Sequence, residues 1–302
     1  MTTSVHAVPS VPLWDDRDRA VVVGVDGSEA NRAAIRWAGQ EAADTHRPLC
    51  LLTVSGDFPS IRDSEAWLSR EQAEGVARLR ELAEQIQLDH PGLVTSRDFE
   101  MGHPVPTLLK ATAGQGMLVV GRRGLGAFGR LLVGSTSIGV AGRSDIPVVI
   151  VPDDWDAESH RTGAIAVGVD AEDVHEQSLQ YAFIEADRRQ VGLTVVHAPH
   201  LYSAIAWDPT YYYVDLREAA LSAGVEALEA VLAPYRAAYP SVQVQTRVAL
   251  AHPGELLLQQ EPDAQLLVLG RKRDGHFGFA FGSISRGVLH YAATPVAVVP
   301  TI

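Results

Sequence analysis

The chain has 302 residues, of which 46% are hydrophobic and 21% are charged, and its formal net charge is −12 at pH 7. This length suits two domains of ordinary size, and the composition is that of a soluble globular protein. Nucleic acids and anionic membranes carry charge of the same sign as the protein. The composition therefore argues against both as its main partners.

The single cysteine, Cys50, excludes an internal disulfide, which suits a reducing compartment. Its apolar neighbours raise the pKa of a thiol, so we interpret Cys50 as a core residue rather than a redox sensor. Residues 1–19 lack the pattern of a signal peptide and are expected to form a flexible leader. No stretch approaches the roughly 20 apolar residues that span a membrane. We therefore expect a cytoplasmic protein.

An internal repeat divides the chain. AVVVGVDGSEANRAAIRWA, at residues 20–38, matches AIAVGVDAEDVHEQSLQYA, at residues 164–182. Three later segments of the first copy, FEMGHPVPTLLK, MLVVGRRGLGAFG and IPVVIVP, match VALAHPGELLLQ, LLVLGRKRDGHFG and TPVAVVP in the same order. The repeat predicts one domain over residues 20–152 and a second over residues 164–302, joined by an acidic linker at residues 153–163.

Each copy predicts the same succession of elements. In the first copy these are strands at about 20–25, 48–54, 94–101, 117–120 and 147–151, with helices between them, including an alanine-rich helix at 29–44 and an amphipathic helix around 76–86. In the second copy they are strands at about 164–169, 192–197, 242–249, 266–269 and 295–299, with a helix at 173–189. Short β-branched runs that alternate with helices predict a parallel sheet covered on both faces. The fold class is thus α/β, with two tandem doubly wound domains, each containing a five-stranded, mostly parallel sheet.

The most distinctive motif is GRRGLGAFGRLLVGSTS, which begins at Gly121 after the fourth strand. No lysine precedes its Ser-Thr pair, so it is not a P-loop. In a doubly wound sheet, ligands bind beyond the carboxyl ends of the strands, where Asp26 also arrives. Gly121 and Gly124 permit close backbone approach, and Gly134 and Ser135 open a helix whose N–H and hydroxyl donors favour phosphate. Asp26 would repel phosphate, so we assign it to the sugar or base of a whole nucleotide.

The spacing Gly121-x2-Gly124-x9-Gly134-Ser135, between VVVGVDGS and IPVVIVP, resembles the ATP-binding signature of the universal stress proteins. The likeness extends from about residue 20 to 300 and is closest to the tandem-domain members common in actinobacteria. It implies a Rossmann-like fold similar to that of adenine nucleotide alpha hydrolases, ATP accompanied by Mg²⁺, and a homodimer that often uses the fifth strand. Carried over by position, the resemblance assigns adenosine to Asp26 and Val54, and the ribose and phosphates to Gly121, Arg122, Gly124, Gly134, Ser135 and Thr136.

The second copy departs from this pattern. Arg273 stands in place of Gly124, VDGS has become VDAE, and the glycine loop is one residue shorter. An arginine can reach phosphate oxygens, or its bulk can close the backbone approach, and both alternatives stay open. The candidate residues of this second site are Asp170, Gly270, Gly282, Ser283 and Ser285.

Three further features have simpler interpretations. His103 and His252 each precede a proline at a helix start, which favours a turn residue at the rim of the site over a metal ligand. The aromatic segment at residues 201–215 is interpreted as packing, with a lid or a partner surface as the alternative. In the Arg122–Arg123 and Arg271–Lys272 pairs, one member could clamp phosphate while the other is solvated.

Residues suited to binding are abundant, whereas no nucleophile elbow, P-loop lysine or paired-carboxylate motif appears. The sequence therefore favours an ATP-binding stress-response regulator that acts on an unidentified protein partner. A slow Mg²⁺-dependent ATP hydrolase or phosphotransferase is the alternative. A structural dimer whose loops bind no nucleotide is the third possibility.

Overall fold

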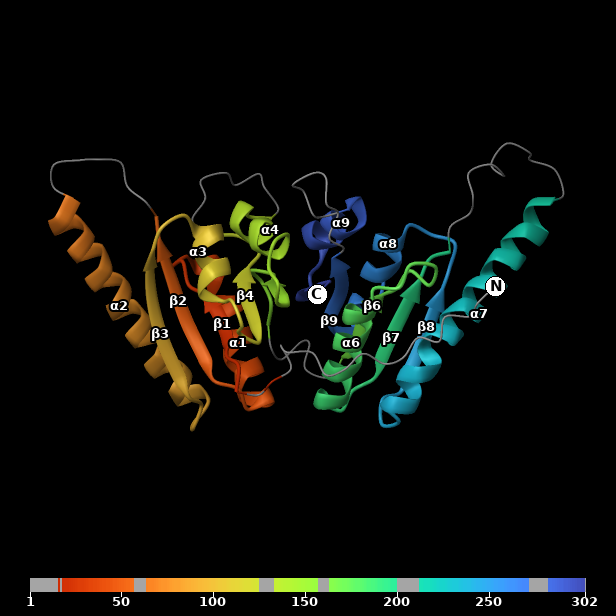
Figure 1. Cartoon of the computed structure of the whole chain (residues 1–302), viewed down its shortest axis with the longest axis horizontal. Helices are drawn as coiled ribbons and strands as arrows, with labels where there is room; N and C mark the ends of the chain where they lie inside the picture. Colours follow the sequence, from red (N-terminus) through yellow and green to blue (C-terminus); the bar gives the residue numbers. More distant parts are fainter. Residues whose placement is uncertain are drawn as a thin grey trace.

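The computed structural model describes residues 16, 18–56, 64–124, 133–156, 163–199, 212–271 and 282–301. Within them, ten strands form one sheet in the order β3-β2-β1-β4-β5-β10-β9-β6-β7-β8. The first half supplies β1 (Val21–Gly24), β2 (Leu49–Ser55), β3 (Thr95–Met101), β4 (Met117–Gly121) and β5 (Val148–Val151). The second half supplies β6 (Ala164–Gly168), β7 (Leu193–His197), β8 (Val244–Val248), β9 (Ala264–Arg271) and β10 (Val296–Pro300). Figure 1 shows the two halves side by side.

The strands of each half are parallel, and the two halves meet through their fifth strands. β5 pairs antiparallel with β10, with Val149 opposite Ala297. The predicted fold class is therefore confirmed, and the two five-stranded sheets are continuous with each other. The edge that the sequence resemblance assigned to homodimerisation is occupied within the chain. The outermost strands of the sheet are β3 and β8.

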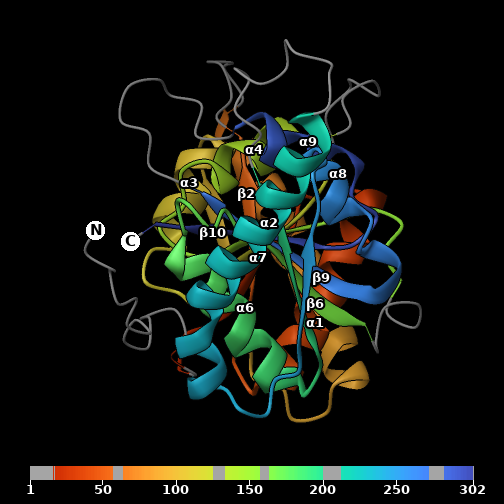
Figure 2. The ribbon, with the colours of Figure 1, turned by 90° about the vertical axis from the view of Figure 1, so that its right-hand side faces the viewer.

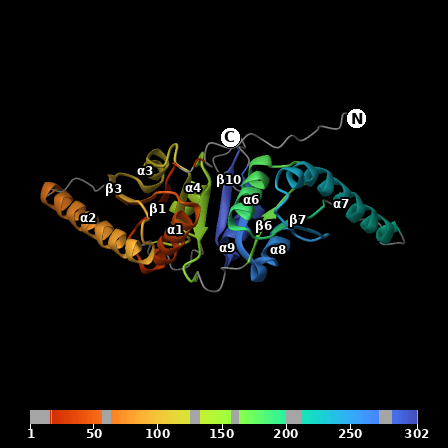
Figure 3. The ribbon, with the colours of Figure 1, turned by 90° about the horizontal axis from the view of Figure 1, so that it is seen from below.

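Helices cover both faces of this sheet. Each face of the sheet has its own hydrophobic core, which we call the first and the second core. The helices that pack with the first core are α1 (Arg32–Thr45), α2 (Ser64–Asp89), α6 (Glu176–Arg189) and α7 (Tyr212–Ala238). Those that pack with the second core are α3 (Pro104–Ala111), α4 (Ser135–Ala141), α8 (Pro253–Leu258) and α9 (Ser283–Tyr291). Short 3₁₀ turns occur at Glu29–Asn31 and Glu261–Asp263. Seen from below, α2 and α7 lie at the two ends of the molecule (Figure 3).

The strand sequences explain this layering. Val21 and Val23 of β1 face the first core, and Val22 faces the second, because successive side chains point to opposite faces of a sheet. Both faces are covered, so the strand has no polar positions. β5 has the same character, and all four of its residues, Val148–Val151, are buried. Each core runs through both halves, which makes the ten-stranded sheet one packing unit.

Two of the sequence interpretations can be placed on this fold. Cys50 in β2 is half-buried, and burial raises the pKa of its thiol, which agrees with a residue at the core rather than an activated thiol. Most of the aromatic segment, residues 201–211, lies outside the described residues. The acidic linker has a buried anchor at its start, because Trp155 packs into the first core.

Candidate functional site

A cavity of about 400 Å³ lies at the carboxyl ends of β1, β2 and β4 in the first half. It is lined by Gly24, Val25, Asp26, Asn31, Leu52, Val54, Pro104, Leu108, Val120, Gly121, Arg123, Gly124, Gly134, Ser135, Thr136 and Ser137. The structure thus brings together every residue predicted for the first site except Arg122. One side of the cavity is apolar and the other carries backbone, hydroxyl and amide groups, the arrangement typical of small-molecule sites.

Asp26 lies at the turn that follows β1. Its Oδ1 atom accepts a hydrogen bond from the backbone N–H of Ser28 at 2.8 Å. Gly27 between them has a φ of +79°, which a residue with a side chain rarely adopts. The Oδ2 atom faces Gly124, and a Cβ on that glycine would lie only 2.3 Å from it. Gly124 therefore keeps the backbone close to the carboxylate, as only glycine can.

The floor of the cavity is held by two side chains that the sequence-based prediction did not include. The Asn31 side-chain amide donates to the carbonyl of Gly24 at 3.0 Å. The Ser137 hydroxyl donates to the carbonyl of Gly121 at 2.7 Å. Both bonds fix the ends of strands that border the cavity. The hydroxyl run Ser135–Ser137 was the available signal for Ser137, whereas nothing in the local sequence distinguishes Asn31.

The glycine loop returns to the cavity at Gly134, whose N–H donates to the carbonyl of Arg122 at 2.7 Å. Gly134 is the N-cap residue of α4, and no side chain caps the N-terminus of this helix at that position. The N–H groups of the first turn of a helix have no partner within the helix, so Ser135 and Thr136 present backbone and hydroxyl donors to the cavity. Residues 125–132 of the loop lie outside the described residues.

The two arginines after β4 point in different directions. Arg122 turns away from the cavity and donates to the carbonyl of Ala292, in the second half, at 2.7 Å. Arg123 lines the cavity and is held by an ion pair with Asp153. The family resemblance assigned Arg122 to the phosphates. In the structure Arg123, and not Arg122, lines the cavity.

A second cavity of about 310 Å³ occupies the equivalent place in the second half. Four of its five predicted residues, Asp170, Gly270, Gly282 and Ser285, line it, and Ser283 does not. Arg273 and Lys272 lie outside the described residues.

The second cavity differs from the first in its chemistry. His175 stands where the first copy has Asn31, and a Cβ on Gly270 would lie 2.4 Å from its ring. The ring Nδ1 accepts from the N–H of Ser178 at 3.1 Å, and burial lowers the pKa of His175. Ile284 replaces Thr136, which removes a hydroxyl donor, and Asp173 adds a carboxylate. The described part of this cavity is therefore less suited to an anion than the first.

Arg271, the equivalent of Arg122, also reaches the other half, although unlike Arg122 it is among the residues that line its own cavity. Its guanidinium donates to the carbonyl of Gly142 at 2.8 Å and also to that of Ser144, at the end of α4. Each half thus extends an arginine to carbonyl groups that directly follow a helix of the other half, α9 or α4. In the views of Figure 1 and Figure 2 these two helices lie near each other at the top of the molecule, midway between α2 and α7. Arg122 and Arg271 are interdomain contacts, which we call the arginine staples.

His103 and His252 occupy the N-cap positions of α3 and α8, each in an extended conformation before a proline. Among the described residues, no three His, Cys, Asp or Glu side chains are grouped so as to hold a metal ion. Within the same residues, no helix is both long and apolar enough to cross a membrane.

Known proteins resemble this chain along nearly its whole length. Residues 19–152 and 162–300 each match the universal stress protein family. A universal stress protein of Mycolicibacterium smegmatis is 33% identical, over 92% of this chain and 96% of its own length. One of Mycobacterium tuberculosis is 33% identical over 93% of this chain and 97% of its own. The crystal structure of a universal stress protein from Archaeoglobus fulgidus has the same fold, with a TM-score of 0.72 at 21% identity, covering 93% of this chain and 98% of that one.

Proposed function

Because the chain belongs to the universal stress protein family, we propose that it is a nucleotide-responsive regulator whose first half binds ATP. The observation that carries this proposal is the convergence of Asp26, Gly121, Gly124 and residues 134–137 on one cavity, although they are spread over more than a hundred positions of the sequence. The cavity volume of about 400 Å³ lies within the range of small-ligand sites, roughly 300–1,000 Å³.

The two sides of the cavity suit the two ends of a nucleotide. Leu52, Val54 and Leu108 form an apolar wall for a base, and the Asp26 carboxylate is placed to accept from sugar or base donors. At the other side, the N–H groups and hydroxyls of Ser135 and Thr136 would hold phosphate oxygens. Mg²⁺, when bound with ATP, supplies positive charge at the phosphates. Asp26 is the one carboxylate among the described lining residues.

We expect the second half to bind nucleotide more weakly. Its cavity has lost the hydroxyl of Thr136 and gained the carboxylate of Asp173, and both changes disfavour phosphate. His175 also fills the space beneath Gly270.

Release of bound nucleotide from the purified protein tests the proposal. We expect denaturation to release adenine nucleotide that chromatography identifies, and added Mg-ATP to raise the thermal midpoint. A ligand at a hundredfold excess over its dissociation constant stabilises the folded state by about 2.7 kcal/mol. If no nucleotide is released and Mg-ATP produces no thermal shift, the proposal is wrong.

Regulation requires that ATP bind two conformations of the protein with different affinity. The partner that reads the change is proposed to be a protein. The alternative, slow hydrolysis of ATP, is tested by following ADP in the same incubations. ADP formation above that of a Gly124→Ala variant would favour the hydrolase.

A further inference from the structure

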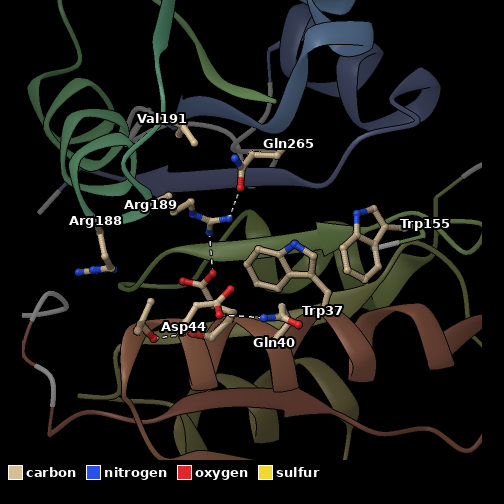
Figure 4. Close-up of a pocket in the computed structure, with 10 residues that line it drawn as sticks. Trp37, Gln40, Asp44, Trp155, Arg188, Arg189, Val191 and Gln265 are labelled. Carbon is tan, nitrogen blue, oxygen red and sulfur yellow. Dashed lines mark hydrogen bonds and ion pairs between the residues drawn. The ribbon is translucent and has the colours of Figure 1, made fainter. Parts of the chain in front are cut away.

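Helices α1 and α6 meet through charged side chains on one face of the ten-stranded sheet. Arg189, the last residue of α6, reaches across the boundary between the halves and donates to Glu41 of α1 at 2.6 Å. The same guanidinium donates to Glu185 at 3.1 Å and to Gln265 at 3.0 Å, and it lies 5.9 Å from the ring centroid of Trp37. Figure 4 shows Arg189 extended between Gln265 and the side chains of α1.

The internal repeat explains why two carboxylates meet here. Glu41 and Glu185 occupy equivalent positions in the two copies, as do Thr45 and Arg189. The approximate twofold arrangement of the halves therefore brings two like charges to one boundary. Arg189 has no charged equivalent in the first copy, so one guanidinium links both carboxylates. We call Glu41, Glu185 and Arg189 the carboxylate cluster.

The cluster is almost completely removed from solvent. The side chains of Glu41 and Glu185 are only 3% and 1% exposed, and that of Arg189 is 16% exposed. The Oε1 atom of Glu41 is buried and has no hydrogen-bond partner among the described residues. An ionised carboxylate oxygen without a donor is costly to bury, whereas a proton on that oxygen removes most of the cost.

The charged and titratable groups that act on Glu41 come from both halves of the chain. They are Arg47, which follows α1, and Tyr181, Glu185, Arg188 and Arg189 on α6, while Asp44 of α1 lines the adjoining cavity. Burial raises the pKa of Glu41 to about 7, with Glu185 adding to the effect and the arginines opposing it. A cavity of about 360 Å³, bordered by Trp37, Trp155 and Arg188, adjoins the cluster and also contacts Glu41 and Arg189.

We propose that the carboxylate cluster is a proton-controlled latch between the two halves, closed when Glu41 carries a proton and weakened when it is ionised. The sign follows from where the proton binds more tightly. In an opened boundary Glu41 is hydrated and has its ordinary pKa of 4.5, whereas in the closed boundary the pKa is raised to about 7. Closure therefore binds a proton, is favoured at lower pH, and weakens as pH rises from about 4.5 to about 7.

The latch is connected to both candidate sites. α1 begins directly after Asn31, on the floor of the first cavity, and α6 begins directly after His175, in the second. Each helix thus runs from a cavity toward the cluster. A shift of α1 against α6 would alter the support of both cavities.

Amide hydrogen exchange as a function of pH, on the full chain without added ligand, tests the latch. Between pH 5.5 and 8 the two pKa values imply a loss of roughly tenfold to thirtyfold in the closed state relative to the open one. We expect protection factors in the second halves of α1 and α6 to fall by that factor, after correction for the intrinsic effect of pH. In Glu41→Gln, a neutral side chain of the same shape, the same amides should show no such fall.

Two further variants sharpen the result. Glu185→Gln removes the second carboxylate and should move the midpoint of the response to lower pH. Glu81→Gln, at an exposed position of α2, should behave as the wild type. The latch is overturned if Glu41→Gln keeps the wild-type response, or if the midpoint in Glu185→Gln is unchanged. It is also overturned if amides of β2 and β7 lose protection equally, because the proton would then affect global stability alone.

Discussion

At the scale of single residues, the first cavity depends on positions where a side chain cannot be added. Gly124 is the sharpest case, because a Cβ there would lie 2.3 Å from Oδ2 of Asp26. Gly134 is milder, since its Cβ would meet the carbonyl of Arg122 at 3.3 Å. In the second half a Cβ on the equivalent Gly282 would meet none of the described residues within 4 Å. The described parts of the two cavities therefore differ in how tightly the backbone is packed around these glycines.

We predict that Gly124→Ala lowers the affinity of the first half for ATP by roughly tenfold to a hundredfold. The added methyl group must displace the Asp26 carboxylate, and a misplaced polar contact costs about 1–3 kcal/mol. Titration calorimetry with Mg-ATP measures the change. Gly287→Ala on α9 is the matched control, because its Cβ would meet nothing within 4 Å in the described part of the chain. Equal affinities in the two variants would contradict this role for Gly124.

A second residue-scale prediction concerns the floor of the cavity. We predict that Asn31→His weakens ATP binding to the first half. In the second half the imidazole of His175, at the equivalent position, packs directly against Gly270, the equivalent of Gly121. The substitution would also remove the bond from Asn31 to the carbonyl of Gly24. The reciprocal His175→Asn should strengthen binding to the second half. Stoichiometry and affinity from calorimetry report both changes, and no change in either variant would show that this position does not distinguish the cavities.

At the scale of elements, the arginine staples link the carboxyl ends of β4 and β9 to residues that follow a helix of the other half. Arg122 is bound to the carbonyl of Ala292, and Arg271 to those of Gly142 and Ser144. Hydrogen bonds to a charged group contribute about 1.5–3 kcal/mol each. We predict that Arg271→Ala lowers the free energy of unfolding by about 2–4 kcal/mol. Arg271 is only 6% exposed, and its removal leaves the carbonyls of Gly142 and Ser144 without this donor.

Urea denaturation measures this loss, and Arg122→Ala should show a smaller one, since it makes one such bond. Arg80→Ala is the control, because its pair with Glu84 is an exposed pair within one helix, with side chains 71% and 61% exposed. Such pairs are worth about 0.3–0.5 kcal/mol. An Arg271→Ala variant as stable as Arg80→Ala would show that the staples do not hold the halves together.

The elements also show where sequence-based prediction ends. Periodicity and β-branched runs predicted the strands and their parallel order, because burial on both faces leaves a clear pattern in short segments. The assignment of Arg122 to the phosphates came from the family resemblance, and in the structure Arg123 lines the cavity while Arg122 donates to the carbonyl of Ala292. Asn31 and the link between Glu41 and Arg189 were not predicted, since they depend on how distant segments meet.

At the scale of the whole molecule, the chain is a dimer-like arrangement made within one polypeptide. β5 and β10 pair at the centre, the carboxylate cluster joins α1 to α6 on one face, and the staples join the halves on the other. Three kinds of contact thus hold one boundary: backbone pairing between apolar strands, buried charges, and arginine–carbonyl bonds. Only the second of these changes its charge near neutral pH.

This arrangement predicts how one half would behave alone. In a fragment of residues 18–156, β5 would become an edge strand of four buried apolar residues, Val148–Val151. An exposed apolar edge pairs readily with another chain. An antiparallel pairing of two β5 strands would reproduce the contact that β10 makes in the full chain. The fragment is therefore expected to dimerise through β5, which light scattering coupled to size-exclusion chromatography measures.

The contact can be tested separately from folding of the fragment. Val149→Lys, in the fragment, places a charge at the centre of the new edge and should yield a monomer, provided that circular dichroism shows the same helix and strand content as the unaltered fragment. A fragment that is folded and monomeric without that change would show that β5 does not require a partner strand. In that case the pairing of β5 with β10 would follow from the staples and the carboxylate cluster, rather than bring the two halves together.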